Sequence, residues 1–134
     1  MFLGEFKHNL TAGKRLALPK KIREQIEGNE VILAKGFEPC IFGFTREAWS
    51  ETARQELAAP ISEVRSRQIR RQMFAGAQVI GIDVQGRVVL PETLIEWAEI
   101  KGELTVIGAG DHFEIWDSAS WKKYSAEIEN QGKS

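Results

Sequence analysis

The chain has 134 residues, of which 43% are hydrophobic and 28% are charged, and its formal net charge is -1 with a pI near 6.2. This composition is that of an ordinary globular protein and excludes a disordered or fibrous class, while the near-neutral charge argues against a generally basic nucleic-acid coat. No apolar run approaches the length of a membrane span and the first residues lack the pattern of a signal peptide, so we expect a cytoplasmic protein without membrane association.

In chain order, the first predicted unit contains a strand, a glycine-containing turn, a second strand, a short helix that begins at a proline, and a hairpin. Residues 15–18 indicate the second strand, and Pro19 with Ile22 and Ile26 indicates the short helix. Residues 31–34 and 40–44 indicate the hairpin. The helix that follows has a good N-cap residue in Thr45, and Phe44 and Trp49 stand at the two positions of a hydrophobic staple. This unit is assigned to residues 1–50.

A helical stretch follows, from about residue 46 to residue 74, and Pro60 is expected to divide it into two helices, with Ser62 as the N-cap of the second. One face of that second helix carries three arginines, for which a solvated face, a subunit contact and a nucleic-acid contact are open interpretations: Arg67, Arg70 and Arg71. Residues 51–75 are assigned to this helical connector.

The second unit, residues 76–124, repeats the first, and residues 125–134 are assigned to a C-terminal tail. Residues 83–91 return the pattern of residues 11–19, and Asp117 with Trp116 and Trp121 returns the cap and the staple. The pairs held in one register are Arg15 with Arg87, Pro19 with Pro91, Ile22 with Leu94, Gly36 with Gly108, Ile41 with Phe113, and Trp49 with Trp121. Because a unit of about sixty residues buries little surface alone, we expect the two units to share one core.

Catalysis, metal binding and a cofactor are not indicated. The single cysteine, Cys40, cannot form an internal disulfide and reads as a buried apolar residue. His8 and His112 have no partner at metal-ligand spacing, and no phosphate-binding glycine loop or nucleophile elbow is present. His112 reads as structural, and for His8 a structural role and a place at the DNA surface are open, the structural role being favoured. The protein is therefore predicted not to be an enzyme, with no metal, no cofactor and no small-molecule substrate.

The N-terminal residues 1–6, the Arg15 to Pro19 segment, the loop of residues 83–87 and the segment of residues 108–117 together resemble the bacterial MraZ family over nearly the whole chain. The resemblance implies an α+β, β-dominated fold: a pseudo-twofold double-hairpin barrel of two swapped-hairpin, AbrB-like modules with flanking helices. It further implies a ring-shaped homo-oligomer and a sequence-specific, nucleoid-associated regulator that binds repeated promoter sites in duplex DNA at the division and cell-wall gene cluster.

The two loops differ from each other. In the family each loop has an Asp-x-x-x-Arg pattern, and Asp83 to Arg87 matches it, whereas the first loop has Thr11 in place of the aspartate and the order Gly13-Lys14. Asp83 and Arg87 can form a charge-assisted clasp within their loop. Arg15 lacks such a carboxylate, so we expect Arg15 and Lys14 to be free to meet DNA, Arg15 with its planar fork and Lys14 as a point charge for phosphate.

The charge distribution favours the first unit as the DNA-facing one, since basic residues crowd it while the matching part of the second unit is acidic. The candidate DNA-binding residues are Lys7, Lys14, Arg15, Lys20, Lys21 and Arg87. Several modules in one ring would bind several repeats at once and so gain affinity. The alternatives are an oligomeric scaffold that has lost DNA binding and, with less support, an antitoxin of the same hairpin class.

Overall fold

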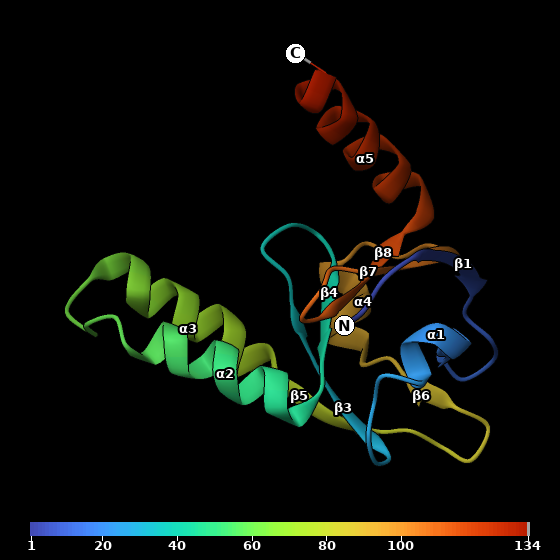
Figure 1. Cartoon of the computed structure of the whole chain (residues 1–134), viewed down its shortest axis with the longest axis horizontal. Coiled ribbons are helices and arrows are strands. Elements are labelled where there is room, and N and C mark those ends of the chain that lie inside the picture. The colour runs from blue at the N-terminus through green and yellow to red at the C-terminus, as the bar shows by residue number, and fades with distance from the viewer. Residues whose placement is uncertain (134) are drawn as a thin grey trace.

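The structure is a computed structural model that describes residues 1–133. It combines a six-stranded antiparallel sheet, in the order β1-β7-β8-β4-β3-β5, with a separate two-stranded ribbon, β2-β6 (Figure 1). The strands are β1 Glu5–Asn9, β2 Arg15–Ala17, β3 Glu30–Lys35, β4 Ile41–Phe44, β5 Gln78–Gly81, β6 Arg87–Val89, β7 Glu103–Gly108 and β8 Phe113–Asp117. The helices are α1 Lys20–Arg23, α2 Arg46–Leu57, α3 Val64–Gly76, α4 Glu92–Trp97 and α5 Ser118–Lys133.

Each repeat gives its first strands to the other repeat. β1 pairs with β7 and β5 pairs with β3, so the first strand of either unit completes the hairpin of its neighbour. β2 pairs with β6, and β4 pairs with β8 at the centre of the sheet, again one strand from each unit. This reciprocal pairing produces an approximate twofold symmetry within one chain, and the largest buried cluster contains residues of both units.

The repeat register slips by one residue in the third strand of each unit. The buried run of β3, residues 31–34, corresponds to residues 104–107 of β7. The amide of Gly36 closes its hairpin on the carbonyl of Cys40, at 2.9 Å, as the amide of Ala109 does on the carbonyl of His112, also at 2.9 Å. The predicted pairing of Gly36 with Gly108 is therefore wrong. Gly108 instead lies against the backbone of Leu3, whose nitrogen would be 2.3 Å from an added Cβ.

The main core lies between one face of the sheet and the layer formed by the ribbon, α1 and α4. Its completely buried members include Leu16 from β2, Ile22 from α1 and Leu94 from α4. A second cluster on the opposite face contains the two predicted staples: the ring centroids of Phe44 and Trp49 are 5.3 Å apart, and those of Trp116 and Trp121 are 5.4 Å apart. Cys40 belongs to this second cluster, and burial raises the pKa of its thiol, as expected for an inert core residue.

The N-caps of α2 and α5 are confirmed. The Thr45 side chain accepts a hydrogen bond from the amide of Ala48 at 3.1 Å, and Asp117 accepts one from the amide of Ser120 at 3.2 Å. α5 then continues to Lys133, so the predicted tail is helical as far as the structure describes it. In Figure 1, α5 rises from the sheet away from α2 and α3.

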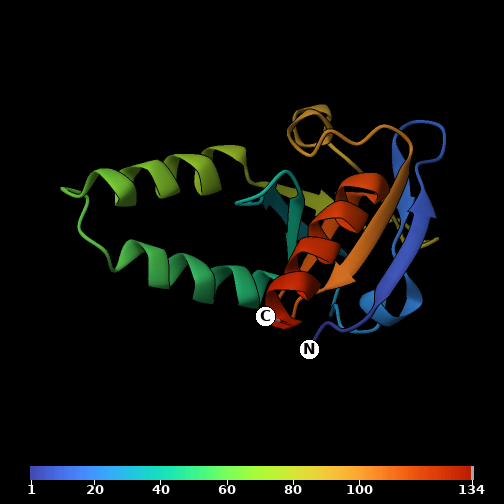
Figure 2. The ribbon, with the colours of Figure 1, turned by 90° about the horizontal axis from the view of Figure 1, so that it is seen from above.

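The helices α2 and α3 form an antiparallel arm that projects from the sheet (Figures 1 and 2). The predicted division near Pro60 is confirmed, but the cap is not Ser62: α3 follows Glu63, whose side chain makes no capping bond. Arg67 donates to the carbonyls of Ile61 and Ser62, and Arg70 to those of Leu57 and Ala59. These two arginines therefore close the tip of the arm, because unpaired carbonyls at helix ends attract cationic donors.

The α+β class is confirmed, but the sheet is open and the helices hold more residues than the strands. β2 and β6 pair only with each other, so the sheet ends at β1 and β5 instead of closing into the expected barrel. Within residues 1–133, no helix combines the length and the apolar character needed to span a bilayer.

Candidate nucleic-acid interface

The two predicted loops meet on the β2-β6 ribbon. Arg15 lies opposite Val89, Leu16 opposite Val88, and Ala17 opposite Arg87. Leu16 and Val88 are 0% and 1% exposed and point into the core. Because successive side chains alternate between the faces of a strand, Arg15 and Arg87 share the outward face of the ribbon. The fold thus places the repeated arginine of each unit on one solvent-facing surface.

Each loop is bound to the other repeat by its backbone. The amide of Leu90 donates to the carbonyl of Lys14 at 2.9 Å, and the amide of Leu18 donates to the carbonyl of Gly86 at 3.0 Å. These two hydrogen bonds are equivalent under the internal twofold, so Lys14 and Gly86 occupy the same place in their loops. Both have a positive φ, 59° at Lys14 and 76° at Gly86. The first loop therefore carries a side chain where the second has glycine, at the cost of some strain.

The predicted clasp is present in the second loop. One oxygen of Asp83 accepts the amides of Gln85 and Arg87, each at 2.9 Å, and the other accepts Nε of Arg87 at 2.9 Å. The amide of Arg87, together with its guanidinium and the amide of Gln85, lowers the pKa of Asp83 below its ordinary value. Arg87 is thus held by one nitrogen, and its terminal nitrogens remain available on the partly exposed side chain.

The clasp predicts an acid-side loss of stability. The pKa of Asp83 is lower in the folded protein than in the unfolded chain. The contribution of its carboxylate to folding stability is therefore complete at neutral pH and is lost as the pH falls through the pKa of the folded state. Carboxyl-detected NMR should show Asp83 titrating below an ordinary aspartate. Asp83→Asn should reduce the dependence of unfolding on pH in this acid range only. An unshifted titration of Asp83 would show that the clasp does not persist in solution.

The first loop is closed differently. Its backbone repeats the second, since the amide of Thr11 donates to the carbonyl of Arg15 at 2.9 Å, but the Thr11 hydroxyl also donates to that carbonyl, at 3.1 Å. The guanidinium of Arg15 makes one long bond, Nη1 to the carbonyl of Ala12 at 3.3 Å. Within residues 1–133 it has no carboxylate partner. The expectation that Arg15 is less restrained than Arg87 is met by this geometry.

Lys14 is not free as expected, because it forms an ion pair with Glu92 at the start of α4. Glu92 was not among the site residues predicted from the sequence. Its repeat position could have indicated it: counted from the two prolines, Glu92 occupies the place that Lys20 occupies in the first unit. An acidic residue of the second unit therefore contacts the loop of the first unit.

The other candidate lysines fall into two groups. Lys20 and Lys21 are exposed on α1, which starts two residues after the Leu18 amide that binds the second loop. They therefore flank the ribbon. Lys7 lies in β1 opposite Thr105, in a hollow shared with residues of α5, while its neighbour Phe6 packs on the main core. Lys7 is thus on the face of the sheet away from the ribbon.

His112 is structural, as predicted. Its two ring nitrogens bond Asp111 at 2.7 Å and Glu114 at 2.8 Å, and its ring stacks on Phe44 with centroids 5.5 Å apart. Burial disfavours the charged ring, but the hydrogen bonds and charges of Glu114 and Asp111 outweigh it, so the pKa of His112 is raised. In the part of the chain that the structure describes, no group of three or more His, Cys, Asp or Glu side chains is arranged so that it could hold a metal ion.

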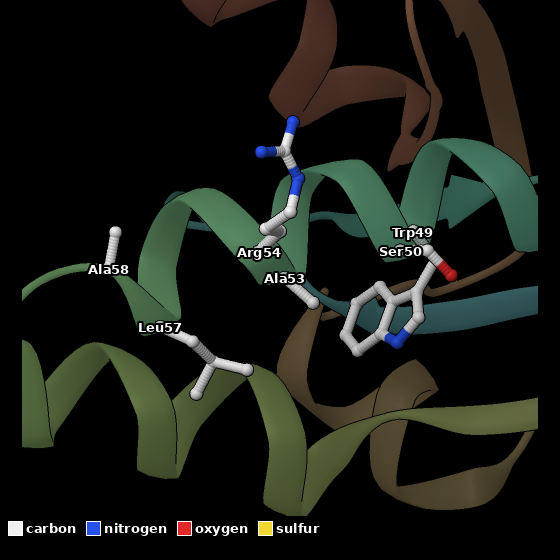
Figure 3. Close-up of a pocket in the computed structure, with 6 residues that line it drawn as sticks. All are labelled: Trp49, Ser50, Ala53, Arg54, Leu57 and Ala58. Carbon is white, nitrogen blue, oxygen red and sulfur yellow. The ribbon is translucent and has the colours of Figure 1, made fainter.

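A hollow on the α2-α3 arm differs from the ribbon in the chemistry of its lining. It is open to solvent and lined by α2 residues, and in Figure 3 Trp49 and Leu57 point toward α3 while Arg54 points away. A small-molecule site normally has a concave apolar wall with a few convergent polar groups. This hollow lacks that convergence, so the ribbon with its two loops is the stronger candidate site.

Strand exchange between tandem repeats, with the two hairpin loops joined in one ribbon, defines a tandem swapped-hairpin protein. A family model described as “MraZ protein, putative antitoxin-like” matches the chain twice, over residues 1–72 and 73–134. The chain therefore belongs to the MraZ family.

Relatives named “Transcriptional regulator MraZ” match most of the chain. The one from Roseiflexus castenholzii is 38% identical over 91% of this chain and 85% of its own length. Those from Desulforamulus reducens and Lactiplantibacillus plantarum are each 35% identical, over 96% and 95% of this chain and 90% and 89% of their own lengths. The shared name describes regulators of transcription and not enzymes, which agrees with the prediction from the sequence.

Proposed function

We propose that this protein regulates transcription by binding duplex DNA with the outward face of the β2-β6 ribbon and its two loops. The observation that carries the proposal is the placement of Arg15 and Arg87 on one exposed face, one from each repeat. A two-stranded ribbon is narrow enough to enter the major groove, and the planar fork of arginine can bind either a phosphate or the acceptor edge of guanine. The name of the relatives supports the same role.

Within this surface, the first loop is the main contact. Arg15 has only one weak restraint, whereas Arg87 is partly neutralised by Asp83. Lys20 and Lys21 extend the positive surface along α1 and would contact phosphates, which add affinity without sequence information. Lys7 lies on the other face of the sheet and is not part of this surface.

The DNA target in this proposal is a set of repeated sites upstream of the division and cell-wall genes, bound by a ring of identical chains associated with the nucleoid. Exposed apolar residues near the tip of the arm support self-association: Leu57, Ile61 and Val64 are 52%, 64% and 58% exposed. The same surface also favours a second candidate function, an oligomeric scaffold without DNA binding. Neither function requires a cofactor or a small-molecule substrate.

Footprinting and binding on designed duplexes separate these functions. Hydroxyl-radical footprinting of the DNA upstream of the protein's own gene should show protection that recurs at each repeat. A duplex with several sites should bind at least about 100-fold more tightly than a duplex with one, because linked sites raise the effective concentration. Equal affinity for one site and several would contradict multivalent binding, and the lack of any footprint would favour the scaffold.

A further inference from the structure

The two loops meet opposite charges in the other repeat. The Leu90 amide holds the first loop and Glu92 follows two residues later, whereas the Leu18 amide holds the second loop and Lys20 follows two residues later. The Glu92 carboxylate forms an ion pair with Lys14, and the twofold puts Lys20 at the equivalent position of the first unit. We propose that Glu92 competes with DNA phosphate for Lys14 and so limits the affinity of the first loop. This inference rests on the proposed DNA-binding function.

The geometry makes the competition direct. Lys14 extends from the loop at a left-handed backbone position, and its carbonyl is tied to the amide of Leu90. Pro91 fixes the backbone between that amide and Glu92, so the start of α4 is held close to the first loop. The side chains of Lys14 and Glu92 are each 53% exposed. A phosphate that approaches the Lys14 ammonium must therefore approach or displace the Glu92 carboxylate.

The pair is weak enough to exchange. Exposed ion pairs contribute little to stability and are screened by salt, so Glu92 can release Lys14 when a phosphate is present. The second loop has no counterpart to this contact. Its carboxylate, Asp83, is bound to the amides and the guanidinium of its own loop, and its glycine offers no ammonium. Glu92 thus acts on the first loop only.

A contact between Lys14 and phosphate carries no base information, so the expected effect is the same on every DNA sequence. Glu92→Gln should tighten binding by about two- to fivefold, the range that corresponds to an exposed ion pair, and by the same factor on the protein's own upstream DNA and on scrambled DNA. It should also steepen the dependence of affinity on salt by about one released counterion. The matched control is Glu96→Gln, which removes the same charge from an exposed position of the same helix.

Fluorescence anisotropy on the full chain tests the inference, with thermal unfolding to verify that each variant folds. Glu92→Gln should bind more tightly than Glu96→Gln, and the gain should shrink in a Lys14→Gln background, where the lysine that Glu92 blocks is absent. If the parent protein binds DNA and the two glutamine variants bind alike, the role of Glu92 is refuted while the proposed function stands. If neither the parent nor Glu92→Gln binds any duplex, the proposed function fails and the inference fails with it.

Discussion

Arg15→Ala is expected to weaken binding to the protein's own upstream DNA by roughly 10- to 100-fold, the loss associated with one well-formed arginine contact to DNA. Arg15 lies on the outward face of the ribbon, and its guanidinium has only the long bond to the carbonyl of Ala12. Its removal leaves the backbone bonds of the loop in place, so the fold should persist. The affinity is measured by anisotropy titration at fixed salt.

Two further variants serve as controls for Arg15→Ala. Arg65→Ala removes the same charge from an exposed position on the arm and should change affinity little. Arg15→Lys keeps the charge but loses the planar fork, so it should retain binding to scrambled DNA and lose preference for the upstream sequence if the fork reads guanine. Arg15→Ala binding as tightly as the parent would refute the assignment of Arg15 to the DNA surface.

Gly43→Ala is expected to lower the free energy of unfolding by about 2–3 kcal/mol through overpacking of the core. Gly43 lies in β4 directly opposite Phe113 of β8, and an added Cβ would be 2.2 Å from the ring tip, Cζ, of Phe113. Phe113 is 0% exposed and packs edge-on against Phe2, with centroids 5.3 Å apart, so the ring has no space into which it can move. Urea denaturation of parent and variant gives the difference.

The control for this effect is Gly81→Ala. Gly81 is also in a strand, β5, but nothing lies within 4 Å of its added Cβ. Alanine there should leave stability unchanged or raise it by about 0.5–1 kcal/mol, because it restricts the unfolded chain. Equal stability of the two variants would mean that the close packing of Gly43 against Phe113 is not present in solution.

Local features of the fold could be predicted from the sequence because local chemistry decides them. Thr45 and Asp117 cap their helices, and the aromatic pairs beside them pack as staples. The duplication and the outward loops were also accessible, since the repeated Arg-containing segment is visible in the chain. The shared core followed from the small size of each unit.

The pairing between repeats could not be predicted in the same way. Under the internal twofold, the central pair Ile41 and Ile115 corresponds to Phe113 and Gly43, so one large ring replaces two aliphatic side chains. Such compensation is visible only when the partner strand is known. The contact of Lys14 with Glu92 has the same origin, because it depends on a neighbour from the other repeat. The one-residue slip between β3 and β7 lies within each repeat, since the turn of the second hairpin is one residue shorter.

Direct DNA binding by the purified protein is the decisive measurement for the proposed function. A fluorescence-anisotropy titration against DNA from upstream of its own gene, with scrambled DNA and a salt series in parallel, measures sequence preference and electrostatic contribution together. Preferential binding to the upstream DNA, falling steeply with salt, is the predicted result. Equal affinity for the two DNAs, or the absence of binding to either, would contradict a sequence-specific regulator.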